Sequence, residues 1–190
     1  PSSGTWVYDN GNIATRWVPD QTYVISARGT DDAIPANEAP NGPLRLTNIV
    51  YDITVPGVVA TGPADKTPQK TVTVVSGTVT DNYAGVQSVR LVLSYLDAGT
   101  TYYWNDEVVP SSFTTAYDDV PAVLAAPGAL ATTWSYDASA ISQFNDGTVL
   151  AREFRVFPYS GDRSGNFFAG ASTKTFVIDN TKPTGHATRP

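Results

Sequence analysis

The segment 86–96, VQSVRLVLSYL, restricts the fold of this chain more than any other part of the sequence. Val89, Leu91, Leu93 and Tyr95 place apolar side chains at every second position. Successive side chains of an extended strand point to opposite faces, so a period of two predicts a half-buried β-strand. We therefore expect the chain to fold around β-sheet.

Further segments rich in β-branched and aromatic residues recur between glycine, proline, asparagine and aspartate residues. They are 57–60, 71–80, 101–104, 112–116, 132–136, 149–159 and 172–179. Short strands at this spacing are typical of an antiparallel sandwich, so we predict an all-β fold with Trp134 and either Phe154 or Val156 in its core. Only 138–144 suits a helical turn, and a crossover loop fits it equally well.

Charge and composition exclude several classes of partner. The 190 residues include 18 acidic and 12 basic side chains, a formal net charge of −6, and the basic residues are scattered. Nucleic acids and anionic membranes require clustered lysine and arginine, so neither is an expected partner. No apolar run approaches the roughly 20 residues that span a bilayer, so we expect no membrane insertion. The absence of cysteine excludes disulfides and thiolate metal sites.

The sequence also repeats itself. TWVYD near the N-terminus echoes TWSYD 128 residues later, and Asp31 echoes Asp162 at a separation of 131. The string DITVPGVVATGP, which begins at Asp52, matches DNTKPTGHATRP, which begins at Asp179, in six of twelve positions. Three ordered matches at nearly one separation predict a repeating unit of about 127 residues, of which the chain holds about one and a half.

This repeat predicts the domain organisation. Residues 1–53 would be the last three strands of one unit, 54–182 a complete unit, and 183–190 the start of the next unit or a linker. Three strands cannot close a sandwich, so 1–53 would expose an apolar face and unpaired edges. Either the preceding residues of a longer chain supply the missing strands, or separate chains complete one another head to tail, with 183–190 as a donated strand.

Six motifs in the complete unit carry a family resemblance. They are VSGTVTDNYAGVQSVRLVLS (75–94), YYWN (102–105), TWSYD (133–137), NDGT (145–148), GDRSGN (161–166) and FVIDNTKP (176–183). In this order they resemble the bacterial Ig-like repeats found in tandem in large secreted and cell-surface proteins, including adhesins and biofilm matrix proteins. The resemblance covers 54–183 and, more weakly, 1–53. It implies Ig-like antiparallel β-sandwich repeats in an extracellular structural protein that spaces, assembles or adheres, with neighbouring repeats of the same or adjacent chains as partners.

A short motif, Asp-x-Thr-x-Pro, stands at both expected domain junctions. Proline fixes φ and cannot donate to a sheet ladder, so each copy should end a last strand and set the exit direction of the chain. The two copies consist of Asp52, Thr54 and Pro56, and of Asp179, Thr181 and Pro183.

Calcium is the cofactor that the loops of the chain favour. Ca²⁺ takes six to eight oxygen ligands, which extracellular modules supply from aspartate, asparagine and backbone carbonyls. Some tandem Ig-like adhesins use linker aspartates in this way, so the resemblance implies one site from Asp52, Asp31, Asp32 and Glu38 and another from Asp179, Asn180, Asp162 and Asn166. The alternative is that these residues only form turns and caps in water, because the chain has no twelve-residue loop with alternating acids.

The alternative function is an accessory carbohydrate-binding Ig-like module of a secreted enzyme. Tyr102, Tyr103 and Trp104 are consecutive, so in a strand at least one ring faces outward, where a glycan or surface receptor could contact it. Packing in the core is the alternative role of these rings.

We expect no enzymatic activity, because the one histidine, His186, has Val59 as its counterpart in the earlier copy, and no catalytic motif is present.

Overall fold

The computed structural model describes residues 7–12, 14–26, 32–35, 46–145, 147, 151–169 and 173–185. The chain divides into two compact units, Pro1–Ile53 and Thr54–Pro190. Strand is the main regular secondary structure in both units, and the sheets are antiparallel apart from one short pair, so the predicted all-β class is confirmed. Among the described residues, no helix is both long enough and apolar enough to cross a membrane.

The first unit contains a two-stranded antiparallel sheet, β1 (Gln21–Ser26) and β2 (Leu46–Tyr51), preceded by the 3-10 helix η1 (Ala14–Arg16). The ring of Trp17 meets that of Tyr23 edge-on, with centroids 4.4 Å apart. None of the hydrophobic side chains described in this unit is fully buried. The sequence predicted three strands here. The third, around TWVYD, lies partly outside the described residues, and its described part, 7–9, is not a strand.

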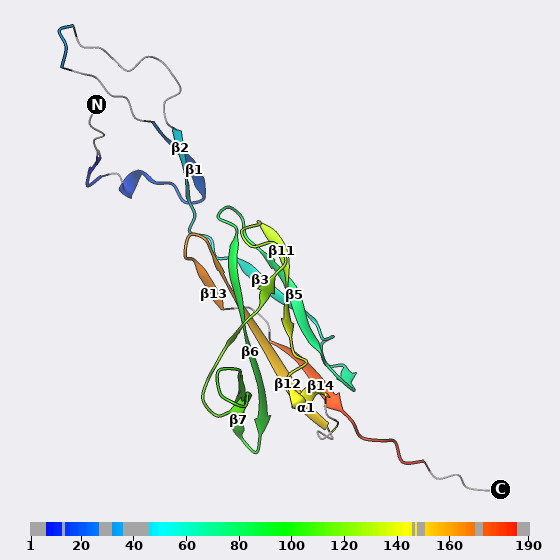
Figure 1. The fold of residues 1–190 in the computed structure, drawn as a ribbon. Coiled ribbons are helices and arrows are strands. Elements are labelled where there is room, and N and C mark those ends of the chain that lie inside the picture. The colour runs from blue at the N-terminus through cyan, green and yellow to red at the C-terminus, as the bar shows by residue number, and fades with distance from the viewer. Residues whose placement is uncertain are drawn as a thin grey trace. The chain divides into compact units, whose positions relative to one another are not determined.

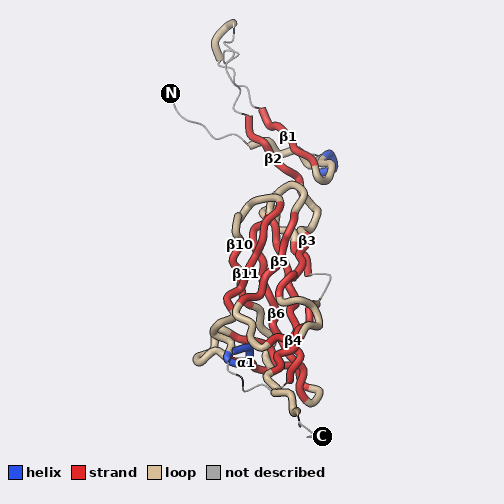
Figure 2. Tube along the Cα trace, turned by 90° about the vertical axis from the view of Figure 1, so that its right-hand side faces the viewer, coloured by secondary structure: helices blue, strands red, loops and turns tan. Residues whose placement is uncertain are grey.

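The second unit contains two sheets (Figure 1). The smaller sheet has the spatial order β10 (Val123–Leu124), β11 (Ala131–Asp137), β5 (Val74–Thr80) and β3 (Gly57–Gly62). The larger has the order β4 (Pro68–Gln69), β14 (Lys174–Asp179), β12 (Ala151–Asp162), β6 (Val86–Asp97), β7 (Thr100–Asn105) and β8 (Ser112–Thr114). Two short strands flank it, since β9 (Val120–Pro121) pairs with β6 and β13 (Phe167–Ala169) with β12. Figure 2 shows that the long strands run roughly along one direction.

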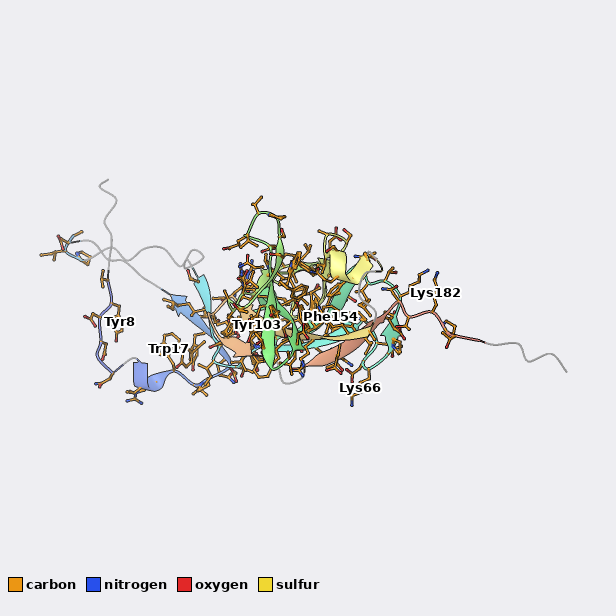
Figure 3. The ribbon with its side chains drawn as sticks, turned by 90° about the horizontal axis from the view of Figure 1, so that it is seen from below. Tyr8, Trp17, Lys66, Tyr103, Phe154 and Lys182 are labelled. Carbon is orange, nitrogen blue, oxygen red and sulfur yellow. The ribbon has the colours of Figure 1, made fainter. Side chains whose placement is uncertain are left out.

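The core of the second unit lies between the inner faces of its two sheets. Trp134 of β11 and Phe154 of β12 are each 1 % exposed, and Phe154 sits deep among the packed side chains (Figure 3). The four apolar residues that predicted β6 are buried, which confirms that strand and its inward face. Val92 and Ser94 on its other face are buried as well, so the middle of β6 is covered on both faces and not half-buried as predicted. Both Phe154 and Val156 point inward, because residues two apart on a strand share a face.

A helical turn does form in the segment for which the sequence left two readings open. It is the four-residue helix α1 (Ser142–Asn145), whose Phe144 is buried against the rings of Phe154 and Phe176. The short strands β4, β9, β10 and β13 were not predicted, since two or three residues are too few to show a period.

The segment 115–119 is held against the outer face of the larger sheet. Arg90 of β6 pairs with the Asp119 carboxylate and donates from Nη2 to its backbone oxygen at 2.9 Å. The hydroxyls of Tyr117 and Tyr159 are hydrogen-bonded, and Tyr159 also donates to Asp119 Oδ2 at 3.3 Å. Tyr117 additionally packs against Tyr103 of β7, with ring centroids 5.3 Å apart. These contacts join three strands of the sheet through one loop.

Candidate metal centre

The candidate centre lies in the second unit, where the β5–β6 turn meets the β12–β13 turn. The two turns are joined directly, because Arg163 N donates to Gly85 O at 3.1 Å. Gly85 has a φ of +82°, and a Cβ there would stand 2.2 Å from the carbonyl oxygen of Gly128. Only glycine fits that position, so the path of the β5–β6 turn is set by its own sequence and by the close approach of the neighbouring loop.

Asp81 shapes the first of these turns. Its Oδ2 accepts hydrogen bonds from the backbone nitrogens of Tyr83, at 3.2 Å, and Gly85, at 2.7 Å. This is the Asx-type turn that an aspartate followed by asparagine and a nearby glycine predicts. The other oxygen, Oδ1, is buried and has no hydrogen-bond partner. The Oδ1 atom can therefore still accept a hydrogen bond or bind a cation.

Asp162 shapes the second turn and is only 5 % exposed. Its Oδ1 accepts from the Asn166 backbone nitrogen at 2.9 Å, and its Oδ2 from the Asn166 side-chain amide at 2.8 Å. The pairing of β12 with β6 shifts register between Gly161 and Asp162, so a bulge ends the regular ladder at this point. Bulges re-aim side chains at sheet edges and beside functional sites.

Carboxylate oxygens of Asp81 and Asp162 lie within 4.8 Å of each other. Two like charges this close repel each other, and the cost grows with their removal from water. Oxygen atoms at this separation can share one Ca²⁺, whose contacts to oxygen are about 2.3–2.6 Å long. The residues present therefore fit calcium, with the orphaned Oδ1 of Asp81 as the observation that favours it.

The structure separates the four ligands predicted for the complete unit. Asp162 and Asn166 come together, but Asp179 pairs with Ala151 at the opposite end of β12. The reason is that β12 and β14 are antiparallel, so the aspartates that end them lie at opposite ends of the sheet. One site made of Asp162, Asn166, Asp179 and Asn180 was therefore a wrong expectation, although two of its members stand in the candidate centre.

The ligands predicted for the earlier junction stay predictions. Asp31 and Glu38 lie outside the described residues, and Asp32 is exposed. Asp52, which directly follows β2, is 5 % exposed, an unusual burial for a carboxylate.

The junction motif has a local structure of its own. Asp179 Oδ1 accepts from Thr181 N at 2.9 Å, which closes a turn just after β14. In the earlier copy Pro56 is buried, and its carbonyl oxygen accepts from Ser160 Oγ at 3.1 Å. Thr54 is half-buried and Pro183 is exposed. Asp52 directly follows β2, and Asp179 is the last residue of β14. Each aspartate thus stands at the end of the second strand of an antiparallel pair.

The three consecutive aromatic residues of β7 alternate as a strand requires. Trp104 is 3 % exposed, and its Nε1 donates to the Tyr136 hydroxyl at 2.9 Å. Tyr102 stacks on Tyr95, with centroids 5.1 Å apart. Only Tyr103 lies on the outer face, half-buried beside Tyr117. Carbohydrate binding at Trp104 would require the core to open, whereas Tyr102 and Tyr103 are both half-buried and keep that prediction.

Sequence reasoning did not include Asp81 among the candidate ligands. The sequence signal that could have identified it is weak: an aspartate directly after a strand, followed by a turn, is compatible with either role. Its nearness to Asp162 depends on two turns about 80 residues apart in the chain.

Comparisons with known proteins add no assignment: no protein-family model matches the chain, and no curated protein matches it.

Proposed function

We propose that the chain is part of a tandem array of Ig-like sandwich modules in a large extracellular protein, where it spaces, assembles or adheres. The observation that carries this proposal is a correspondence between the two units in how their strands pair. Tandem modules that contact mainly their neighbours form extended, quasi-linear objects, which suits a structural rather than a catalytic role.

The correspondence can be followed pair by pair. The echoes of Asp31 in Asp162 and of Asp52 in Asp179 are separated by 131 and 127 residues. We add 131 to the residue numbers of β1 and 127 to those of β2. Five of the residue pairs between β1 and β2 then become residue pairs between β12 and β14. Tyr23 and Ile49, for example, become Phe154 and Phe176. Pairing register is a property of the folded chain, so this agreement supports the repeat independently of sequence identity.

Strand order supports the Ig-like part of the proposal. An Ig sandwich has one sheet in the order A, B, E, D and a second in the order G, F, C, with C′ and C″ added in the variable type. The order β3, β5, β11, β10 fits the first, and β14, β12, β6, β7, β8 fits the second. The inter-sheet disulfide of antibody domains has no counterpart, since cysteine is absent. Trp134 of β11, packed over Gly77 of β5, fills the core instead.

Calcium gives the proposed module a means of stiffening. Bound Ca²⁺ would supply positive charge and draw oxygen ligands around it. Asp81 and Asp162 would hold it, while Asn166 keeps the Asp162 carboxylate oriented through two hydrogen bonds. Because Asp81 also accepts from two backbone nitrogens of its turn, an ion at its free oxygen would tie the β5–β6 turn to the β12–β13 turn. This fits a module that must transmit tension without losing its loop structure.

Two measurements on the parent protein in its source test the proposal. Antibodies raised against residues 54–185 should label intact cells or their secreted matrix, and electron microscopy of the purified parent should show an extended, beaded particle. Labelling that appears only after cells are opened would contradict the extracellular location. A compact globular particle would contradict the tandem array.

A further inference from the structure

The sheet of the first unit has an apolar face that the described part of the unit leaves uncovered. Tyr23 and Ile25 of β1 and Ile49 and Tyr51 of β2 lie on this face, since each pair is two residues apart on its strand. Trp17 packs against it, with ring centroids 4.4 Å from Tyr23 and 6.1 Å from Tyr51. All four side chains keep part of their surface exposed, and Tyr51 is 36 % exposed. We call this surface the β1–β2 face.

The corresponding face in the second unit is completely covered. The pairing correspondence places Phe154, Val156, Phe176 and Ile178 at the positions of Tyr23, Ile25, Ile49 and Tyr51. Each of these four is at most 1 % exposed. The side chains that cover them belong to the smaller sheet and include Val58 of β3, Val75 and Val79 of β5 and Trp134 of β11. The same pattern of residues is therefore a core face in one unit and an open face in the other.

The aromatic packing beside the two faces also corresponds. Phe144, from the short helix ahead of β12, meets Phe154 edge-on at 4.7 Å and 78°. Trp17, which directly follows η1 ahead of β1, meets Tyr23 edge-on at 4.4 Å and 87°. The first unit thus reproduces one of the two faces of a sandwich core, together with the aromatic ring that packs beside that face.

The edges of this sheet indicate what else it lacks. In the second unit β12 pairs with β6 on its other side, and β14 pairs with β4. Among the described residues, β1 and β2 pair only with each other. A two-stranded ribbon is marginally stable in water, and open edges next to an apolar face favour the addition of strands.

We propose that the β1–β2 face docks a β-sheet built like β3 and β5, together with a strand like β6 on the edge of β1, to complete a second sandwich. The docking partner is thus a stretch of this same type of repeat, with valine and alanine at alternate core positions. Supply in the same chain is favoured by chain order, because β3, β5 and β6 all precede β12 in the complete unit. The inference rests on the repeat that underlies the proposed function but not on its location or its role.

An extended chain tests this directly. A copy of residues 54–128 is joined ahead of Pro1 of the full chain, since the separation of 128 residues places Pro1 opposite residue 129. Backbone amide exchange is then measured for β1 and β2 in the extended and the original chain. We expect exchange in β1 and β2 to slow by roughly tenfold or more in the extended chain, because amides of a closed sandwich open only with the whole unit.

The control carries the same extension with Leu91→Asp and Leu93→Asp in the copied strand. Both leucines are buried in the core of the second unit, so these changes place two charges in the core that the copied strand would share with β1 and β2 and prevent the sandwich from closing. The control should leave β1 and β2 exchanging as in the original chain. Three results would overturn the proposal: β1 and β2 already as protected as β12 and β14 in the original chain, equal slowing by the extension and its control, or no slowing by the extension. Protection of the original chain that rises with its own concentration would assign the face to a second copy and so contradict supply in the same chain. None of these outcomes depends on labelling of cells or on the shape of the parent particle.

Discussion

Gly77 of β5 lies under the indole ring of Trp134 of β11, its direct partner in the ladder: a Cβ added to Gly77 would stand 2.4 Å from Trp134 Cζ2. The same Cβ would stand 2.0 Å from the backbone oxygen of Val59. The largest fully buried side chain of the core therefore depends on a missing side chain across the strand. This glycine is needed for packing and not for an unusual φ.

Gly77→Ala should destabilise the second unit by about 3 kcal/mol, because the contact with Val59 involves backbone and the indole has no free space to move into. Urea unfolding followed by far-ultraviolet circular dichroism measures the change. Gly57→Ala is the matched control in β3, where the added Cβ meets only Thr80 Oγ1 at 3.7 Å, an ordinary contact. Equal effects of the two substitutions would contradict the packing argument.

Calcium should raise the melting temperature of the chain relative to EDTA, since a ligand that binds only the folded state adds stability. At ten times its dissociation constant the gain is about 1.4 kcal/mol. Asp81→Asn and Asp162→Asn should each remove most of this gain. In EDTA, Asp81→Asn should not lower the melting temperature, because its Oδ1 accepts no hydrogen bond and the change removes one of two repelling charges. Asp162→Asn should lower it slightly, because both oxygens of Asp162 accept hydrogen bonds from Asn166 and an amide can keep only one of them. Differential scanning calorimetry in EDTA and in millimolar CaCl₂ measures both effects.

Two further acid-to-amide substitutions locate the ion. Asp106→Asn, in the exposed β7–β8 loop, should leave the calcium gain intact. Asp179→Asn should also leave it intact, since Asp179 lies at the other end of β12 from Asp162. A loss in Asp179→Asn would move the site to that end of the sheet. No gain in the wild-type chain at millimolar Ca²⁺ would rule out calcium as its ligand.

Tyr136→Phe should cost about 1–3 kcal/mol, because it leaves the buried Nε1 of Trp104 without its hydrogen-bond acceptor. The double substitution Trp104→Phe with Tyr136→Phe should cost clearly less than the sum of the two single changes, since both partners of one bond are then absent. Equilibrium urea unfolding of the four chains gives the coupling energy. Strict additivity would mean that the bond contributes nothing.

Stability should decline at alkaline pH in a way that depends on Tyr159. Burial, with smaller contributions from the Tyr117 hydrogen bond and the Asp119 charge, raises the pKa of the Tyr159 hydroxyl well above its ordinary value. The unfolded chain then loses this proton near pH 10 while the folded chain keeps it. The stabilisation is complete below pH 10 and is lost above it, at up to about 1.4 kcal/mol per pH unit for each proton. Tyr95 and Tyr136 act in the same direction, since burial raises the pKa of both.

The free energy of unfolding measured between pH 8 and pH 11 checks this. Tyr159→Phe should make the decline above pH 10 shallower, whereas Tyr83→Phe, in an exposed turn, should leave it unchanged. Identical slopes in the wild type and Tyr159→Phe would show that Tyr159 does not hold its proton in the folded chain.

Most long strands could be predicted from sequence because alternation is a local property. The eleven-residue pattern 86–96 predicted β6 and its core face, and seven further segments predicted strands that the structure contains. Four strands of two or three residues, β4, β9, β10 and β13, were missed, because they exist only through pairing with a longer neighbour, as β9 does with β6. The candidate metal centre was predicted in part: Asp162 and Asn166 belong to one turn and were found together, while Asp81 was not connected with them.

The sequence by itself determined the all-β class, the inward faces of the main strands and the repeated strings, since these follow from side-chain period and from identity along the chain. Only the tertiary structure decided which carboxylates meet. Asp162 and Asp179 are the last residues of two neighbouring antiparallel strands, so they lie at opposite ends of one sheet. Asp81, in contrast, lies close to Asp162, because a backbone hydrogen bond from Arg163 to Gly85 joins the two turns. Contacts of this kind arise from chain reversals between distant segments, which no local pattern records.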